Sequence, residues 1–300
     1  MGSCLSGSIL VKRTLRRARN SHKGDFGHAI IVAGSPGMAG AAFLSAKAAL
    51  MSGAGKVTLA TQPSVYSIIG TALPECLHIP VHWNRSWKTD VRKLQKVAEG
   101  AQALGIGPGW GRQANHRTVV KDLLEHVRVP LLMDADALWA LRGQLSILKK
   151  ATHPVILTPH DGEFRYLFGA NKLREIMGRK AVAKELSNQY HCILVRKGPG
   201  TLVASPHLRE DLYQNKTGNP GMASGGVGDV LLGLITGLAA QGFKPFAAAR
   251  LGVFIHGRAG DLARRQVGES ALTATDILQH IPAVLKELEK QGSLPSTLIG

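Results

Sequence analysis

Cysteine is scarce in this chain of 300 residues. The three cysteines, Cys4, Cys76 and Cys192, are odd in number, lie far apart and form no C-x-x-C pair. This pattern excludes a disulfide framework and argues against a structural zinc site. Such sparing use of cysteine fits a reducing compartment, so we expect a cytoplasmic protein.

Several signatures of other protein classes are missing. No apolar run is long enough for a secretory signal or a membrane span. The sequence has no H-E-x-x-H metal motif and no G-x-x-x-x-G-K-[ST] phosphate loop. In residues 105–111, Trp110 stands where a G-x-G-x-x-G fingerprint needs glycine. These absences exclude a P-loop and a dinucleotide fingerprint.

Acidic residues are few: 20 Asp and Glu stand against 37 Lys and Arg, for a formal net charge of +17. This charge either attracts anions or only makes a basic, soluble surface. The basic residues form no nucleic-acid-binding motif, so we expect no nucleic acid and no membrane as partners. Residues 1–20 are a basic N-terminal segment. Its MGSCLS start fits a myristoylation pattern and its Arg-rich stretch fits a transit peptide, and the sequence favours neither.

Short β-branched runs alternate with Ala- and Leu-rich runs through most of the chain. This alternation predicts an α/β fold, with a mainly parallel central sheet and helices on both faces. We expect one domain over residues 21–290 and a loose C-terminal tail over 291–300. The predicted strands are residues 28–34, 56–61, 101–107, 129–138, 153–160 and 192–198, with a hairpin at 200–205 and 210–214. The predicted helices are residues 38–55, 174–189 and 275–290, a segment after 112, and an apolar run that begins near 229.

Glycine-rich or acidic motifs follow most of the predicted strands: GSPGMAG, GIGPGWG, DADAL, TPHDGEF and RKGPGT. In a parallel sheet, ligands bind outside the carboxyl ends of the strands. We therefore expect these motifs to gather into one site. Asp134 and Asp136 of DADAL are weaker candidates, and Asp136 fits a helix N-cap equally well.

The most specific motif is ASGGVGDVLLGLITG, in which glycines precede Asp229 at the start of an apolar helix. Gly225, Gly226 and Gly228 let backbone N–H groups approach a ligand, and the helix N-terminus adds its positive dipole end. The motif therefore predicts an anion site. By itself Asp229 fits a helix cap. Beside an anion site, its carboxylate can accept a proton from a hydroxyl group during phosphoryl transfer.

The stretch NKTGNPGMASGGVGDVLLG closely resembles the signature of the NAD(P)H-hydrate dehydratases, members of the ribokinase-like superfamily. Further blocks resemble the family in the expected order, and the resemblance covers residues 21–282; they include LPECL, GIGPGWG, MDADALWAL, TPHDGEF, VRKGPGTLVA, GVFIHGRAGDLA and ALTATDILQHIP. The resemblance implies a ribokinase-like fold and a hydro-lyase of metabolite repair. Such an enzyme dehydrates the S epimer of hydrated NADH or NADPH, coupled to cleavage of ADP or ATP with release of phosphate.

The resemblance also implies roles for individual residues. Asp229 would be the general base and would contact the hydrate. The other implied hydrate-binding positions are Ala41, Ala42, Gly107, Gly109 and His160. The implied nucleotide-binding positions are Lys197, Gly198, Pro199, Gly200, Thr201, Gly225, Gly226 and Gly228. Mg²⁺ would accompany the nucleotide, and Glu163 would help to hold it through water, because Mg²⁺ keeps several waters and uses few carboxylates.

Three positions depart from the family pattern. Asp161 stands where the family usually has proline, and Ser224 and Val227 stand where it often has threonine. Asp161 adds negative charge near a phosphate-rich site, which leaves the nucleotide affinity open. We expect ADP as the donor, as in bacterial members, and a homo-oligomer, a tetramer by resemblance. The alternative is a ribokinase-like kinase of a thiazole or pyrimidine alcohol, which shares the G-x-G-D loop.

Overall fold

Strand residues alternate between two hydrophobic cores, one on each face of a central sheet. In strand β1 (His28–Val32), Ala29 and Ile31 join one core, while Ile30 and Val32 join the other. All four are 0% exposed, so the strand is buried on both faces. This is the burial expected of a parallel sheet covered by helices on each side.

The computed structural model describes residues 15–83, 87–169, 172–206 and 212–299. The MGSCLS motif and most of the basic N-terminal segment lie outside the described residues. Of the part that is described, Arg17 donates to the carbonyl oxygen of Gly53 at 2.7 Å, and Arg16 donates to that of Glu289 at 2.8 Å. These two arginines therefore bind carbonyl groups near the C-terminal ends of two helices, where cations are favoured.

The sheet of the described residues has nine strands in the order β3-β2-β1-β4-β5-β6-β7-β8-β9. Strands β1 to β7 pair in parallel, and β8 and β9 are antiparallel additions at one edge. Beyond β1, the strands are β2 (Lys56–Thr61), β3 (Leu77–Pro80), β4 (Ala103–Ile106), β5 (Leu131–Met133), β6 (Val155–Leu157), β7 (Ile193–Arg196), β8 (Leu202–Ala204) and β9 (Leu212–Gln214). The mainly parallel sheet predicted from the sequence is confirmed.

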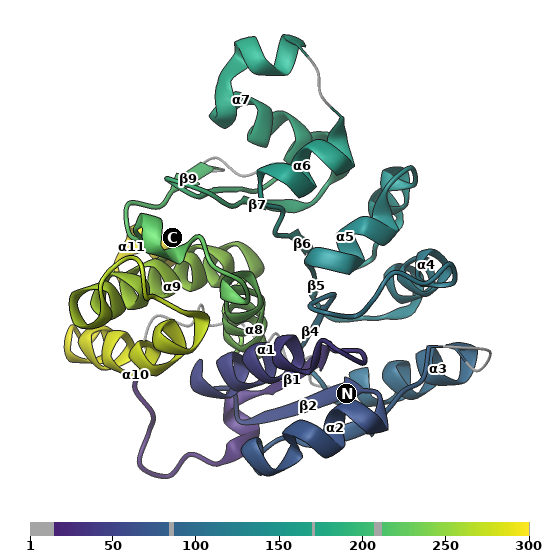
Figure 1. Ribbon diagram of the computed structural model, residues 1–300, viewed down its shortest axis with the longest axis horizontal. Helices are drawn as coiled ribbons and strands as arrows, with labels where there is room; N and C mark the ends of the chain where they lie inside the picture. The colour runs from purple at the N-terminus through teal and green to yellow at the C-terminus, as the bar shows by residue number, and fades with distance from the viewer. Residues whose placement is uncertain (1–14, 84–86, 170–171, 207–211, 300) are drawn as a thin grey trace, which may run out of the picture.

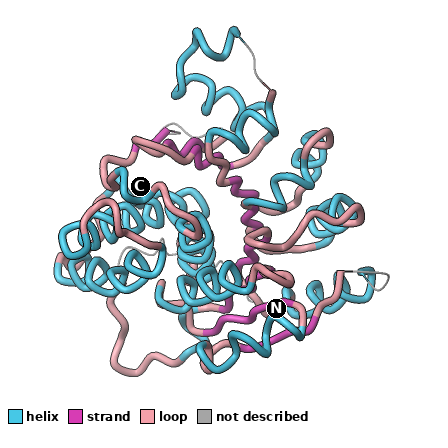
Figure 2. Tube along the Cα trace, viewed as in Figure 1, coloured by secondary structure: helices cyan, strands magenta, loops and turns pink. Residues whose placement is uncertain are grey.

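Helices cover both faces of the sheet, as predicted (Figures 1 and 2). One face is covered by α1 (Ala39–Met51), α8 (Val227–Ala240), α9 (Pro245–Val267) and α10 (Ala274–Lys290). The other face is covered by α3 (Trp87–Ala98), α4 (His116–His126), α5 (Ala135–Leu141), α6 (Asp161–Phe168) and α7 (Lys172–Tyr190). The remaining described elements are α2 (Pro63–Ile69), α11 (Ser296–Ile299) and the 3₁₀ turns η1 (Lys23–Phe26), η2 (Gly70–Ala72), η3 (Leu145–Lys150) and η4 (Pro220–Met222).

Two expectations are wrong in detail. The strand predicted over 129–138 ends at Met133, and Asp134 is the N-cap of α5, which contains Asp136. The chain turns there because Ala135 takes a positive φ of 46°. The tail is not loose where it is described: Leu294, Leu298 and Ile299 are buried, since helix α11 packs against α9. Sequence reasoning missed α2, β3, α3, α6 and α9.

Candidate active site

Loops that follow different strands meet at the carboxyl edge of the sheet. Gly34, after β1, donates its N–H to the carbonyl oxygen of Pro108, after β4, at 2.9 Å. The Ser35 hydroxyl donates to the carbonyl oxygen of Gly109, also at 2.9 Å. A Cβ at Gly109 would lie 2.9 Å from the Cβ of Ala41, so two of the predicted hydrate-binding positions are neighbours.

Asp136 holds the GIGPGWG loop from the other side. Its carboxylate accepts the Gly111 N–H at 2.8 Å and the Arg112 Nε–H at 3.0 Å. Gly107 packs so closely on the backbone carbonyl of Asp134 that no side chain fits there. In this structure Gly107 is therefore a packing position, while Gly109 borders the loop before α1.

Lys197 connects the ends of three strands. It follows β7, and its ammonium lies 2.8 Å from the Asp134 carboxylate, after β5, and 3.6 Å from the Glu163 carboxylate, after β6. Burial alone would lower the pKa of Lys197, but the carboxylates of Asp134 and Glu163 outweigh it and the pKa is raised. Lys197 therefore places a fixed positive charge among the carboxyl ends of strands β5, β6 and β7.

The first turn of α8 lies directly over this ion pair. A Cβ at Gly228 would lie 3.2 Å from the Lys197 Nζ and 3.4 Å from an Asp134 carboxylate oxygen, so only glycine leaves that space open. Gly225 has no described atom within 4 Å of its Cβ position, whereas Gly226, with φ of +83°, approaches Leu44 and Ala274. Gly225 thus borders open space, Gly228 packs against the Lys197–Asp134 ion pair, and Gly226 packs the start of α8.

Asp229 is half-buried in the first turn of α8, and no described residue donates a hydrogen bond to its carboxylate. Gly226 is the N-cap, so Asp229 does not act as a side-chain cap. Burial, the largest cause, and the charge of Asp134 raise the pKa of Asp229 to about 7, although Lys197 opposes the shift. A carboxylate with this pKa can both take and release a proton near neutral pH.

His256, in α9, was not predicted as a site residue. Its Nε2 lies 3.0 Å from the carbonyl oxygen of Val227, the first residue of α8. Burial lowers the pKa of His256 to about 4, so the ring is neutral and Nε2 donates to the carbonyl oxygen, which can only accept. His256 thereby fixes the helix start that carries Asp229. A histidine inside a largely apolar helix was the available signal.

His160 caps α6 instead of only ending a strand. Its Nδ1 accepts the N–H groups of Gly162 and Glu163 at 3.0 and 3.2 Å, and Glu163 accepts the His160 N–H at 2.9 Å. The ring is exposed, and its Nε2 lies 3.5 Å from Glu163. His160 is therefore linked to Lys197 through Glu163, at the rim of the site.

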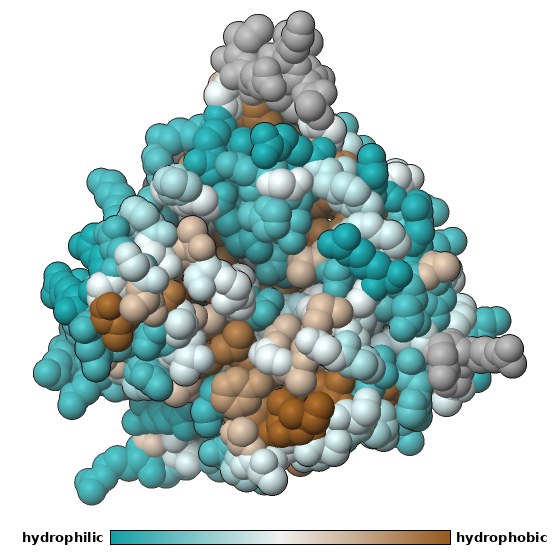
Figure 3. All heavy atoms as spheres, in the orientation of Figure 1, coloured by the Kyte–Doolittle hydropathy of each residue, from teal (hydrophilic) through white to brown (hydrophobic). Residues whose placement is uncertain are grey.

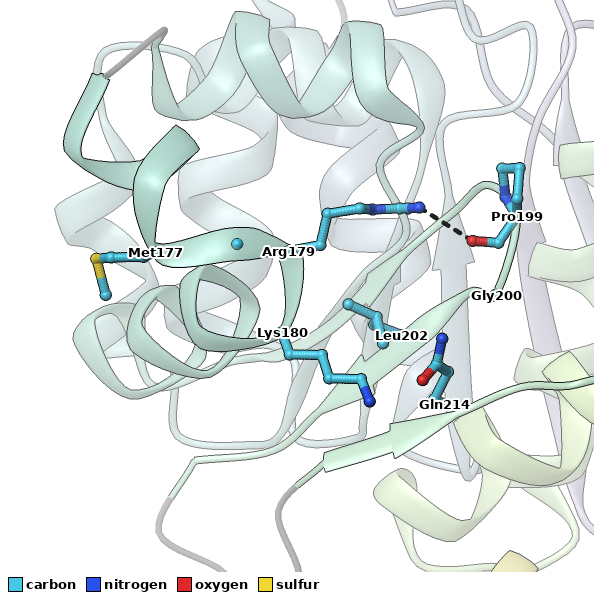
Figure 4. A pocket seen from close by; sticks show the side chains of 8 residues that line it. Met177, Arg179, Lys180, Pro199, Gly200, Leu202 and Gln214 are labelled. Carbon is cyan, nitrogen blue, oxygen red and sulfur yellow. Dashed lines mark hydrogen bonds between the residues drawn. The ribbon is translucent and has the colours of Figure 1, made fainter.

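The loop after β7 borders a pocket of about 310 Å³ (Figure 4). The pocket lies between α7 and the β8–β9 hairpin and is lined by Met177, Gly178, Arg179, Lys180, Pro199, Gly200, Leu202 and Gln214. This volume is at the lower end of small-molecule sites, about 300–1,000 Å³. Thr201 closes the loop by donating to the Gly198 carbonyl oxygen at 3.0 Å. The predicted nucleotide loop thus adjoins a real pocket, although Asp229 does not line it.

Ala42 does not reach the site. It is 0% exposed and packs under Gly34, whereas its neighbour Ala41 is half-buried beside Gly109. Among the described residues, no three His, Cys, Asp or Glu side chains cluster to hold a metal ion. Glu163 is thus the single predicted metal position, and its partners here are His160 and Lys197.

The surface of the face seen in Figure 1 is mostly hydrophilic, and apolar side chains gather over the region of α1 and α2 (Figure 3). Ile68 of α2 is 68% exposed, and Leu77 of the edge strand β3 is 52% exposed. No helix among the described residues has the length and hydrophobicity to cross a membrane.

Comparison with known proteins shows the family of the chain. Residues 29–283 match the model of the NAD(P)H-hydrate dehydratase family. The chain belongs to this family. The sequence is 34% identical to the ADP-dependent (S)-NAD(P)H-hydrate dehydratase of Bacillus subtilis, over 93% of this chain and 96% of that protein.

The chain spans about half the length of other curated relatives that it matches. It is 41% identical to the bifunctional NAD(P)H-hydrate repair enzyme Nnr of Moorella thermoacetica, over 92% of this chain but 52% of that protein.

Solved structures show the same fold. An ADP/ATP-dependent NAD(P)H-hydrate dehydratase from Bacillus subtilis, crystallised with ATP and Mg²⁺, superposes with a TM-score of 0.78 at 32% identity, covering 91% of this chain and 94% of that one. A ribokinase-like superfamily protein from Enterococcus faecalis gives a TM-score of 0.77 at 28% identity, with 95% of each chain covered. The predicted ribokinase-like fold is confirmed.

Proposed function

We propose that this chain dehydrates the S epimer of hydrated NADH or NADPH, with cleavage of ADP or ATP and release of phosphate. The observation that carries the proposal is Asp229, a carboxylate in the first turn of α8 with a pKa of about 7 and no described hydrogen-bond donor. The family membership of the chain supports the same activity. ADP is the proposed donor, as for the ADP-dependent relative from Bacillus subtilis.

The proposed reaction begins with the ring hydroxyl of the hydrate. Asp229 accepts the hydroxyl proton while the oxygen attacks the terminal phosphorus of the nucleotide. The bond from that phosphorus to the bridging oxygen breaks, which leaves AMP from ADP or ADP from ATP. Phosphate then leaves the ring with the electron pair of its C–O bond. The adjacent ring carbon releases a proton to water, and the electron pair of that C–H bond re-forms the ring double bond.

The residues around Asp229 suit this transfer. Gly225 borders open space before the N-terminus of α8, and Lys197, next to Gly228, adds a fixed positive charge. Ala41 and Gly109 are the proposed hydrate-side positions, with His160 at the rim. The loop 197–201 and its pocket are the proposed nucleotide side.

The donor set fits Mg²⁺ only as a companion of the nucleotide. Glu163 is the proposed carboxylate, beside Lys197, and Mg²⁺ is commonly held by one or two carboxylates, waters and substrate phosphates. When bound, the ion neutralises phosphate charge. Glu163 would hold its waters, and the protein supplies the proton acceptor and the remaining positive charge.

The experiment is incubation of the protein with hydrated NADH or NADPH and either ADP or ATP. We expect the near-ultraviolet absorbance of the reduced nicotinamide ring to return only when a nucleotide is present, with one phosphate released per ring restored. A stable phosphorylated hydrate without recovery of absorbance would overturn the proposal. Phosphorylation of thiazole or pyrimidine alcohols would instead indicate the kinase alternative.

We also propose a cytoplasmic homo-oligomer, a tetramer. The apolar side chains gathered over the region of α1 and α2, where Ile68 is exposed, support an interface, because contiguous exposed apolar patches mark interaction surfaces (Figure 3). The two described cysteines, Cys76 and Cys192, are free and buried, which fits a reducing compartment. Sedimentation analysis tests the tetramer, and a monomer at all concentrations would contradict it.

A further inference from the structure

Arg179 binds the backbone of loop 197–201, the proposed nucleotide loop. It follows Gly178, where α7 is interrupted by a non-helical φ of 79° and ψ of 160°. Its Nη1 donates to the carbonyl oxygen of Pro199 at 3.0 Å (Figure 4). Its Nη2 donates to the carbonyl oxygen of Lys197 at 3.2 Å. One guanidinium group therefore binds the two carbonyl groups that flank Gly198.

The direction of these carbonyl groups fixes the direction of two N–H groups. The chain has no cis peptide among its described residues, and in a planar trans peptide the C=O and the following N–H point to opposite sides. The carbonyl groups of Lys197 and Pro199 point at Arg179, so the N–H groups of Gly198 and Gly200 point away from it. No described residue accepts a hydrogen bond from either N–H. Both are free to bind an acceptor on the ligand side.

Glycine is needed at both positions for this geometry. Gly198 has φ of +129° and Gly200 has φ of +63°, values that side chains rarely allow. The Cβ position of Gly198 lies 3.1 Å from Arg179 Nη2, so the guanidinium fills the space that a side chain would occupy. Pro199 between the two glycines has no N–H, so the loop presents the N–H groups of these glycines, and backbone N–H groups aimed to one side can bind an anion.

Asp161 completes the arrangement and balances its charge. Its carboxylate lies 3.1 Å from Arg196 Nε and 3.9 Å from Arg179 Nη2. The negative charge at this position is therefore paired with two arginines instead of facing the phosphates. Asp161 links the start of α6 to the end of β7 and to α7.

We propose that Arg179 is a positioning residue for the phosphates of the nucleotide: it turns two peptide groups so that their N–H groups face the ligand. This inference rests on the proposed use of loop 197–201 for the nucleotide. The planar fork of arginine is required, because two donors must reach two carbonyl oxygens at once. A lysine ammonium is a single point charge and does not span them.

The test is titration calorimetry of ADP and ATP with the full chain, comparing the wild type with Arg179→Ala and Arg179→Lys. Both variants should bind each nucleotide at least about tenfold more weakly. The reason is that they lose the strong hydrogen bonds by which the charged guanidinium group holds loop 197–201 in its binding conformation. In kinetics, KM for the nucleotide should rise while KM for the hydrate stays unchanged. Free guanidinium ion should restore part of the nucleotide affinity to Arg179→Ala, but not to the wild type.

Arg128→Ala is the matched control. Arg128 is exposed at the opposite edge of the sheet, before β5, and also donates one side-chain hydrogen bond, to Thr152. The Arg128→Ala variant should bind nucleotide as tightly as the wild type does. Thermal unfolding without nucleotide shows whether each variant is folded, and if Arg179→Ala is not, Arg179→Lys carries the test. Wild-type affinity in a folded Arg179 variant would overturn the inference. Nucleotide binding by a wild type that restores no reduced ring would instead overturn the proposed function.

Discussion

The pKa of Asp229 depends on charged side chains that come from other parts of the chain. Asp134 and Glu163 disfavour its ionised form, and Lys197 favours it. Because burial adds to the effect of the carboxylates, the pKa rises to about 7 instead of staying near its ordinary value. A base whose pKa is close to the working pH is well matched to proton transfer.

Replacement of this carboxylate tests its role directly. Asp229→Asn keeps the shape of the side chain but cannot accept the hydroxyl proton, so turnover should fall by about 100- to 10,000-fold. Calorimetry should show ADP and ATP binding largely unchanged, because loop 197–201 is intact. A rate near that of the wild type would show that Asp229 is not the base.

The acidic limb of the pH profile follows from the same balance. A general base must be deprotonated, so kcat/KM of the wild type should fall as the pH drops through about 7. Asp134→Asn removes a negative charge that raises the pKa of Asp229 and frees Lys197, its partner at 2.8 Å. Both changes favour the ionised base, so the limb should move to lower pH. Asp122→Asn, on α4, is the control, and an unmoved limb in Asp134→Asn would refute the charge balance.

The sequence predicted the parts of this site that are local in the chain. Asp229 and its glycines form one motif, and Lys197 begins another, so each can be recognised without a structure. Asp134 received little weight because its partner Lys197 comes from a different strand. Arg179 gave no signal at all, since its acceptors are backbone carbonyl groups, which every residue carries.

At the level of elements, hydrophobicity predicted the strands and helices better than their ends. The run VPLLMDADAL reads as one strand, because apolar residues continue past the acids. The structure divides it at Asp134, where the positive φ of Ala135 turns the chain into α5. At this turn, Gly107, just after β4, packs against the carbonyl group of Asp134, just after β5. Secondary-structure propensities, which depend on local sequence, cannot predict such a contact.

Helix α8, whose first turn carries Asp229, packs closely on α1. A Cβ at Gly233 would overlap the backbone carbonyl group of Ser45 and lie 2.9 Å from the Cβ of Ala48. Gly233→Ala should therefore force the helices apart and lower the free energy of unfolding by about 1–3 kcal/mol. Gly40→Ala, in α1, adds the same methyl group to open space and should be neutral or slightly stabilising. Urea unfolding measures both, and equal stability of the two variants would contradict close packing of α1 and α8.

On the scale of the whole molecule, the alternation of strands and helices sufficed for the architecture. Buried parallel strands are short apolar runs, and six of them were recognised. The edge strand β3 was missed because its residues are at least partly exposed, so no apolar run marks it. The two cores also enclose polar residues that hydrophobicity does not predict, among them His28, His116 and His256.

These three histidines predict how the stability of the whole fold depends on pH. Burial lowers the pKa of His28, His116 and His256 to about 4, below the unfolded value of 6.5. Below pH 6.5 the unfolded chain therefore takes up protons that the folded chain excludes, and the free energy of unfolding falls as the pH drops from 6.5 toward 4. Each histidine contributes a slope of up to about 1.4 kcal/mol per pH unit.

The His28→Gln variant tests this dependence and keeps an acceptor for the Thr58 hydroxyl. The slope of its unfolding free energy against pH should decrease by the equivalent of up to one proton, measured by urea unfolding between pH 7 and 5. His22→Gln, at an exposed position, should leave the slope unchanged. An equal slope in wild type and His28→Gln would show that His28 takes up its proton in the folded state.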